Sequence, residues 1–159
     1  MSGEIPAEVS ILTDVNVVAI GLTDDHPVHD EVFPWLRDAL DGPNTLLVPD
    51  YYPLRAQYIM TRNFEVETVA ARNAVQSLLA SPARIVGATD TVLSEAYDIN
   101  AEKDHDVYDS FVLAMARAHD ADYLVTTDDD FELLCAGEDV KYRNPIPENE
   151  RDRLSLADG

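Results

Sequence analysis

Short apolar runs alternate along the chain with longer stretches in which apolar residues recur at the three- and four-residue spacing of a helix. This alternation predicts an α/β fold with three layers, α/β/α, around a central, mostly parallel sheet of about five strands. Strands are predicted at residues 9–13, 45–48, 84–87, 123–126 and 140–143. Helices are predicted at residues 15–22, 28–40, 109–119 and 128–134, in two consecutive stretches within 54–79, and from residue 91 onward.

Several predicted helices carry recognisable signals. The first is too apolar for a surface loop and is read as a short buried helix closed by Gly21. Pro34 lies inside the second, which predicts a kink there. Thr91, followed by Ser94 and Glu95, resembles a capping box offset by one residue. These signals make the helical boundaries testable.

The chain has 159 residues, enough for one well-packed domain and few for two. No internal repeat or low-complexity linker divides it. We therefore predict a single domain over residues 1–147, followed by a polar tail at residues 148–159 that frays from the domain.

The single cysteine and the hydropathy pattern bear on the compartment. Cys135 cannot form an internal disulfide, which indicates a reducing environment, and we read it as a small buried apolar residue. No apolar run approaches the length of about 20 residues that a membrane helix needs, and the first residues lack the pattern of a signal peptide. We expect a cytoplasmic protein with no membrane contact.

The chain is strongly acidic, with 31 Asp and Glu residues against 11 Lys and Arg residues and a formal net charge of −20. Its hydrophobic content of 46% is too high for a disordered chain. One interpretation is a halophilic surface adapted to very salty cytoplasm, and another is an acidic surface that attracts a basic partner. The charge disfavours nucleic-acid binding in dilute buffer. A nuclease working in molar salt is not excluded, because repulsion there is screened over about 3 Å.

Three aspartates are predicted to meet at one edge of the sheet. Asp14 follows the first strand, Asp128 follows the fourth, and Asp109 lies in the first turn of the helix that leads into the fourth. That helix runs back across the sheet, so its first turn lies level with the carboxyl ends of the strands, where ligands bind in open α/β sheets. Carboxylates gathered there repel one another unless a proton or a cation intervenes, and Mg²⁺ or Mn²⁺ suits their oxygens. Such a site could cleave phosphodiesters without a side-chain nucleophile.

Three segments resemble the acidic motifs of PIN domains, a family of metal-dependent ribonucleases that includes many VapC-type toxins of toxin–antitoxin pairs. They are residues 12–17, 106–116 and 124–131, in the family's order, and residues 140–147 resemble its closing strand and Asn-Pro. The resemblance spans nearly the whole chain and suggests an acidic member of haloarchaeal type.

The resemblance implies that Asp14, Asp109 and Asp128 bind Mg²⁺ or Mn²⁺ and that a metal-activated water cleaves RNA. Asp130 is then a candidate auxiliary ligand, Thr126 the small polar residue that positions the edge, and Asn16 a hydrogen-bonding neighbour of the first acid. It also implies an RNA substrate, an antitoxin protein as partner, and a homodimer formed through the helical face.

One position departs from the family's pattern. PIN domains usually carry a glutamate early in the helix after the second strand, and Arg55 stands there. Arg55 could bind a substrate phosphate, fill the metal position with a fixed cation, or form a salt bridge with the acidic edge. The departure motivates an alternative function, a catalytically impaired PIN-fold module that binds RNA or a partner.

Plainer interpretations stand beside these. Asp109 and Asp128 also suit helix starts, where an acid stabilises the helix dipole by roughly 0.3–1 kcal/mol. Asp14 lies between two apolar runs, where burying an unpaired carboxylate is costly, which favours a functional role. An acidic phosphatase or phospho-acceptor domain is a third hypothesis, ranked last because Asn16 stands where that chemistry needs a second aspartate. The four histidines show no metal-binding spacing among themselves.

Overall fold

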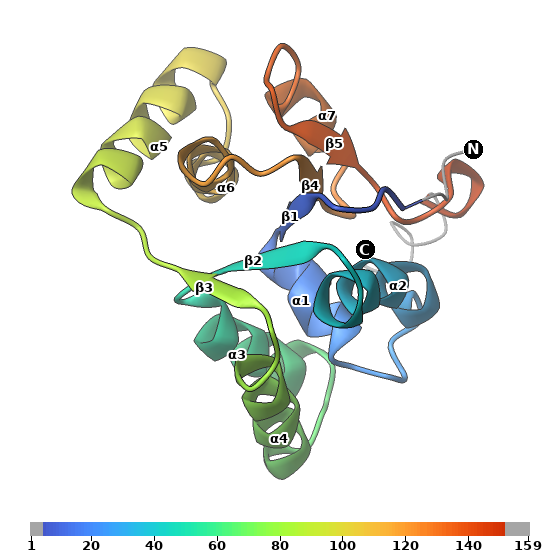
Figure 1. Ribbon diagram of the computed structural model, residues 1–159. Coiled ribbons are helices and arrows are strands. Elements are labelled where there is room, and N and C mark those ends of the chain that lie inside the picture. The colour runs from blue at the N-terminus through green and yellow to red at the C-terminus, as the bar shows by residue number, and fades with distance from the viewer. Residues whose placement is uncertain (1–4, 152–159) are drawn as a thin grey trace.

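Five parallel strands form one sheet in the order β3–β2–β1–β4–β5 in the computed structural model, which describes residues 5–151 (Figure 1). Leu12 lies at the centre of the sheet, paired with Leu47 on one side and Leu124 on the other. The strands are β1 (Ser10–Thr13), β2 (Thr45–Pro49), β3 (Arg84–Val86), β4 (Tyr123–Val125) and β5 (Lys141–Arg143). The predicted sheet is confirmed, and every observed pairing is parallel.

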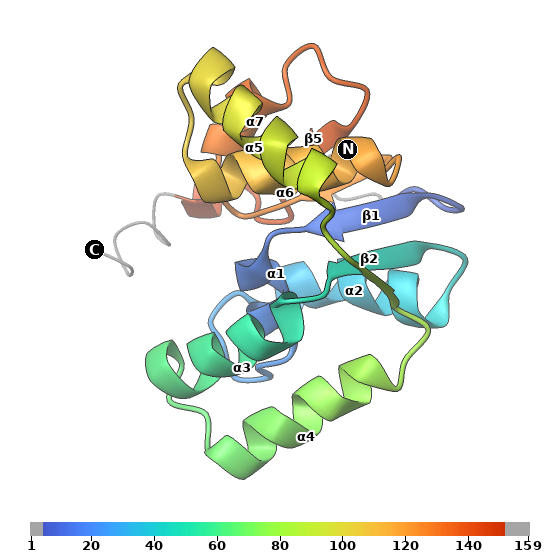
Figure 2. The same cartoon turned by 90° about the vertical axis from the view of Figure 1, so that its left-hand side faces the viewer.

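Helices cover both faces of the sheet, which confirms the predicted three-layer fold (Figure 2). Alternate strand residues point to opposite faces, so Ile11 packs in the core with α1 to α4, while Leu12 packs in the core with α5 to α7. The helices are α1 (Val15–Gly21), α2 (His29–Asp41), α3 (Tyr52–Asn63), α4 (Thr68–Leu79), α5 (Asp90–Lys103), α6 (Val107–Ala118) and α7 (Asp130–Leu134).

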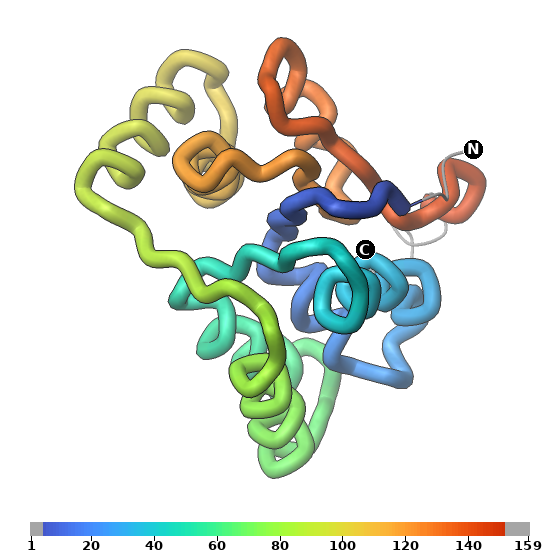
Figure 3. The backbone as a smooth tube through the Cα atoms, in the orientation of Figure 1, coloured from blue at the N-terminus to red at the C-terminus, as the bar shows by residue number. Residues whose placement is uncertain are grey.

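The path of the backbone creates a reversal beside β1. The chain first builds β1, β2 and β3 toward one edge, then crosses through α5 and α6 to the other side of β1, where β4 and β5 follow (Figure 3). The connections leaving β1 and β4 therefore run in opposite directions along the sheet, one toward β2 and the other toward β5. In open α/β sheets, the crevice outside the carboxyl ends of strands at such a switch point is the place where ligands bind.

The predicted elements agree with the observed ones to within a few residues, but the N-cap residue predicted for α5 was wrong. The helix starts at Asp90, and the hydroxyl of Thr89 accepts a hydrogen bond from the Val92 amide at 3.2 Å. Thr89 has the extended backbone of a cap residue, whereas Thr91 already lies inside the helix. β3 ends at Val86, three residues before Thr89, so Thr89 can cap the helix.

Gly21 ends α1 as predicted, and packing adds a second reason for glycine there. A Cβ atom at this position would lie 1.9 Å from Cδ1 of Leu36 on α2. Glycine therefore lets the two helices approach closely. Trp35 on α2 and Cys135 after α7 are also buried, and burial raises the pKa of the Cys135 thiol to about 11.

The start of the predicted tail folds against the domain. Residues 148–151 are helical, and the Arg151 side chain donates hydrogen bonds to the Ile146 carbonyl at 2.9 Å and to Asp129 Oδ1 at 3.2 Å. The rest of the predicted tail, residues 152–159, lies outside the described residues. Within residues 5–151, no helix has the length and hydrophobicity to cross a membrane.

Candidate metal and substrate site

Asp14 occupies the carboxyl end of β1 as the N-cap of α1. Its Oδ1 accepts a hydrogen bond from the Val17 amide at 3.0 Å, and its Oδ2 accepts one from the Thr126 hydroxyl at 2.7 Å. Burial raises the pKa of Asp14 to about 6, against the lowering effect of these two hydrogen bonds, and the charge of Asp128 raises it further. The two hydrogen bonds thus fix the carboxylate in a buried position that destabilises its charged form.

Asp109 lies in the first turn of α6, one of the elements that flank the reversal in the sheet. Burial and the charges of Asp128 and Asp106 raise its pKa to about 6, and His105 opposes that rise. The Nε2 atom of His105 lies 3.4 Å from Asp109 Oδ2, one helical turn earlier in the chain. The negative charge of Asp14 also contributes to the rise.

Asp128 follows β4 and is tied to Asp14 through Thr126. The buried Thr126 hydroxyl, which donates to Asp14, accepts a hydrogen bond from the Asp128 amide at 3.1 Å. The Asp128 side chain is exposed and accepts a hydrogen bond from the Asp130 amide at 2.9 Å. Asp130 is exposed at the start of α7, and no contact joins its carboxylate to Asp14 or Asp109 in the described structure.

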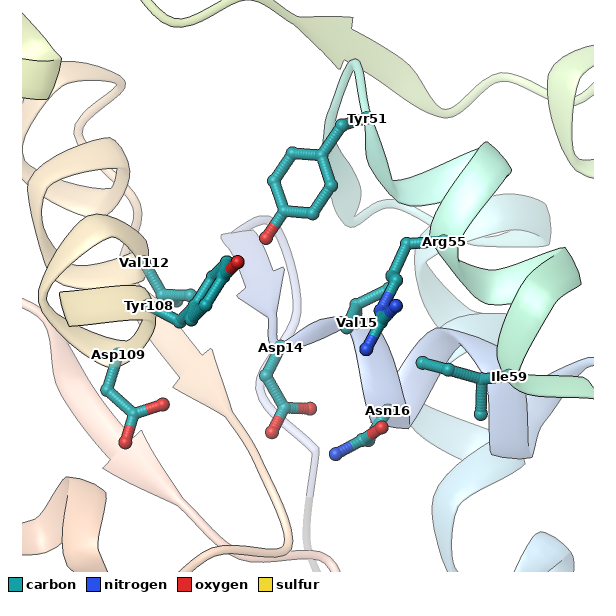
Figure 4. A pocket seen from close by; sticks show the side chains of 9 residues that line it. All are labelled: Asp14, Val15, Asn16, Tyr51, Arg55, Ile59, Tyr108, Asp109 and Val112. Carbon is teal, nitrogen blue, oxygen red and sulfur yellow. The ribbon is translucent and has the colours of Figure 1, made fainter. Parts of the chain in front are cut away.

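A pocket of about 370 Å³ opens between α1, α3 and α6 (Figure 4). The carboxylates of Asp14 and Asp109 lie at one end, and Arg55 reaches in from α3 on the side opposite Asp109. The other residues lining it are Val15, Asn16, Tyr51, Ile59, Tyr108 and Val112. The pocket therefore places two carboxylates, a guanidinium and two phenols around one space.

Asn16 and Arg55 do not behave as two of the interpretations expected. Asn16 lines the pocket but makes no hydrogen bond to Asp14, whose carboxylate accepts from Thr126 and Val17 instead. Arg55 forms no salt bridge with any acid among residues 5–151. Its guanidinium carbon lies 5.1 Å from the centre of the Tyr58 ring instead.

The donor chemistry of the pocket suits a hard divalent cation, since its acids offer only carboxylate oxygens. As placed, however, the described part of the chain contains no group of three or more His, Cys, Asp or Glu side chains arranged to hold a metal ion. Asp14 and Asp109 are the acids that line the pocket, and the charge of Asp128, which does not line it, raises the pKa of both. A bound ion would have to draw these carboxylates together.

Three contributors to the site did not emerge from the sequence. Burial raises the pKa of Tyr51 to about 12, and its phenol lines the pocket near Asp14. The buried Tyr52 hydroxyl donates to the Thr13 carbonyl at 2.8 Å and holds the end of β1 against α3. Tyr108 is exposed next to Asp109. The tyrosine pair directly after the second strand is the signal that could have pointed to the first two.

The fold and its carboxylate pocket define an α/β protein with an acidic site at a switch point, and the sequence agrees. The model of the PIN domain family matches residues 11–136, and the chain belongs to that family. No curated protein matches the chain.

Solved structures show the same fold at low sequence identity. VapC20 of Mycobacterium tuberculosis, a sarcin-ricin loop cleaving toxin, is 17% identical, with a TM-score of 0.64 over 82% of this chain and 98% of that one. VapBC2 of Rickettsia felis, bound to a DNA fragment from its promoter, is 15% identical, with a TM-score of 0.63 over 85% and 98%. A toxin–antitoxin complex from Klebsiella pneumoniae is 17% identical, with a TM-score of 0.58 over 82% and 94%.

Proposed function

We propose that this protein is a metal-dependent endoribonuclease and the toxin of a toxin–antitoxin pair. The observation that carries the proposal is the pocket in which Asp14 and Asp109 face each other at the switch point of a PIN fold. Both carboxylates have a pKa raised to about 6, and a divalent cation would relieve the repulsion behind part of that rise.

Each residue near the pocket has a role in this proposal. Asp14 and Asp109 hold Mg²⁺ or Mn²⁺ with Asp128, and Asp130 is an auxiliary ligand. A bound ion supplies a coordinated water of lowered pKa and offsets charge on the scissile phosphate. Thr126 fixes the direction of the Asp14 carboxylate through its hydrogen bond.

The remaining side chains of the pocket act on the substrate. Arg55 binds a phosphate of the RNA, because its guanidinium reaches the pocket without a carboxylate partner among the described residues. Asn16 is exposed at the pocket wall and offers an amide to the sugar or phosphate. Val112 and Ile59 supply the apolar wall that limits water around the reacting groups.

Structural neighbours support the toxin role and its partners. One is described as a toxin that cleaves the sarcin-ricin loop and another as a toxin–antitoxin complex. We accordingly propose an RNA substrate, an antitoxin protein as partner, assembly as a homodimer, and action in the cytoplasm.

A second function remains in contention because of two observations. The acids in the described structure do not form a ready group of three ligands, and Arg55 replaces the usual glutamate. A PIN-fold module that binds RNA or a partner without cleaving it would show both features. Calorimetry in molar KCl separates the two functions, because the module binds no Mn²⁺ and the nuclease does.

Hydrolysis of a fluorescent single-stranded RNA in molar KCl tests the nuclease directly. We expect cleavage with Mn²⁺ or Mg²⁺, none in EDTA, and a loss of about two orders of magnitude in rate, near 3 kcal/mol, for Asp14→Asn and for Asp109→Asn. Asp98→Asn changes an exposed residue of α5 in the same chemical way, away from the pocket, and should cleave normally. Cleavage that persists in EDTA or in the Asp14 variant would refute the proposal.

A further inference from the structure

Positive charge is concentrated in one part of this acidic chain. Residues 51–89, which form α3, α4 and β3, contain four arginines and two glutamates, a net charge of +2. Because the whole chain has a net charge of −20, the residues outside this stretch have a net charge of −22. Between residues 51 and 64, which include the whole of α3, no acid occurs at all.

These arginines also differ from other basic residues in their partners. Outside residues 51–89, four of the six described Lys and Arg side chains form salt bridges with Asp or Glu. None of the four arginines within that stretch has a carboxylate within salt-bridge distance in the described structure. In a chain with 31 acids, cations left without acidic partners remain available to an external anion.

Three of the residues on α3 form a continuous strip that starts at the pocket. Arg55, Tyr58 and Arg62 follow one another at helical spacing, so they share a face of the helix. The guanidinium carbons of Arg55 and Arg62 lie 5.1 Å and 5.4 Å from the centre of the Tyr58 ring. Tyr58 remains 50% exposed, so part of its ring is open to a further flat group beside the two guanidinium groups. We call Arg55, Tyr58 and Arg62 the α3 strip.

We propose that the α3 strip binds the RNA strand next to the cleavage pocket, with Arg62 on a backbone phosphate beyond the one held by Arg55 and a base stacked on Tyr58. This inference rests on the proposed function. Seven residues of helix separate the two arginines by about 10 Å along the axis, which spaces their contacts along the strand. Aromatic rings interleaved with cations suit single-stranded nucleic acid, because every base has a flat face to stack.

The position of the strip favours RNA over an acidic protein segment as the occupant. Arg55 belongs to both the strip and the carboxylate pocket, so a strand whose phosphate reaches the pocket would continue over Tyr58. The surrounding negative charge repels a polyanion elsewhere on the surface. The α3 strip thus offers a polyanion a route to the pocket that avoids most of the acids.

Anisotropy of a fluorescein-labelled 12-nucleotide single-stranded RNA tests the inference, with EDTA present and the RNA verified as intact on a gel. Arg62→Gln should weaken binding severalfold and lower the slope of log K against log salt concentration by about 0.7, the value for one phosphate contact on a single strand. Tyr58→Ala should weaken binding about tenfold through lost stacking, and Tyr58→Phe should restore it. Arg37→Gln on α2 is the control, because it removes the same charge from an exposed arginine already paired with Asp38.

The possible outcomes separate this inference from the proposed function. RNA binding that changes equally in Arg62→Gln and Arg37→Gln would overturn the strip even if the protein cleaves RNA. The inference would also be overturned if the wild-type protein did not bind the RNA. It would be overturned as well if the strip variants bound an acidic peptide such as poly-glutamate more weakly but bound RNA as the wild type does. In cleavage assays, a raised KM with unchanged kcat for Arg62→Gln supports the strip. Failure of cleavage in a protein that still binds RNA through the strip contradicts only the nuclease.

Discussion

The hydroxyl group of Thr126 donates a hydrogen bond to Oδ2 of Asp14, and the 2.7 Å contact joins segments 112 residues apart. It connects the carboxyl ends of β1 and β4 on either side of the switch point. The same hydroxyl accepts a hydrogen bond from the Asp128 amide, so one side chain orients the Asp14 carboxylate and holds the backbone at Asp128. The precision of the acidic site therefore depends on a neutral residue.

Replacing Thr126 with valine should impair both activity and stability. Valine keeps the shape but loses the hydroxyl, so Asp14 loses a hydrogen bond that lowers its pKa and the Asp128 amide loses its acceptor. We expect the free energy of unfolding to fall by about 1–3 kcal/mol and RNA cleavage to slow by at least tenfold. Urea denaturation and initial rates measure the two effects. Thr126→Ser retains the hydroxyl and should behave nearly as wild type, and equal losses in both variants would contradict this role.

The charge on Asp14 should destabilise the fold at neutral pH. Its pKa rises from 3.8 in the unfolded chain to about 6 in the folded one, so the neutral form is favoured by folding. Its contribution is fully present below pH 3.8 and is lost as the pH rises through 6. Asp14→Asn keeps a cap on α1 without the charge but loses the oxygen that accepts from Thr126. Its stability relative to wild type should therefore be higher at pH 7.5 than at pH 4 by about 1–2 kcal/mol, after discounting for solvent screening.

Thermal melts in EDTA at pH 4 and pH 7.5 measure this change with pH. Asp14→Ala is the control, because it also removes the charge but loses the hydrogen bond from the Val17 amide. It should be less stable than the asparagine variant by about 0.5–2 kcal/mol at either pH. A stability gain in Asp14→Asn that is the same at both pH values would show that the charge is not its cause.

Glu138 should show the opposite dependence on pH. It accepts hydrogen bonds from Arg117 at 2.6 and 2.7 Å and from Lys103 at 3.0 Å, which lower its pKa from 4.5 to about 2. Its stabilising effect is thus present above pH 4.5 and is lost as the pH falls toward 2. Glu138→Gln should cost about 1–3 kcal/mol at pH 7, less in molar salt, and little at pH 2. Glu95→Gln removes a more exposed partner of Arg117 and should cost less in the same urea titration.

The sequence predicted the sheet, the order of elements and the place of Asp14 and Asp109 beside one pocket, because each follows from local patterns, whereas Asp128 does not line that pocket. Strands and helices have distinct hydrophobic periods, and parallel strands bring their carboxyl ends to one edge. Asp14 follows a strand and Asp109 opens a helix that returns to the sheet. Those two facts place both acids without any knowledge of tertiary contacts.

The parts that the sequence could not supply depend on register and packing. Thr126 reaches Asp14 because β1 and β4 pair with Thr13 opposite Val125, a register that no local pattern specifies. Glu138 accepts hydrogen bonds from Arg117 and Lys103, which lie 21 and 35 positions earlier in the chain. Arg55 was identified by counting along the helix, but its contact with the Tyr58 ring, rather than with an acid, required the fold.

Restoring an acid at position 55 should strengthen metal binding. Arg55→Glu removes a cation from the pocket wall and adds a carboxylate there, and both changes favour the binding of a divalent ion. We expect Mn²⁺ affinity, measured by calorimetry in molar KCl, to rise by tenfold or more, about 1.4 kcal/mol. Arg55→Gln removes the cation without adding a ligand and should give a smaller gain. Both variants lose a proposed phosphate contact, so their RNA affinity in EDTA should fall while their affinity for metal rises. Unchanged Mn²⁺ binding in both variants would mean that Arg55 does not limit the metal site and would favour the non-catalytic module.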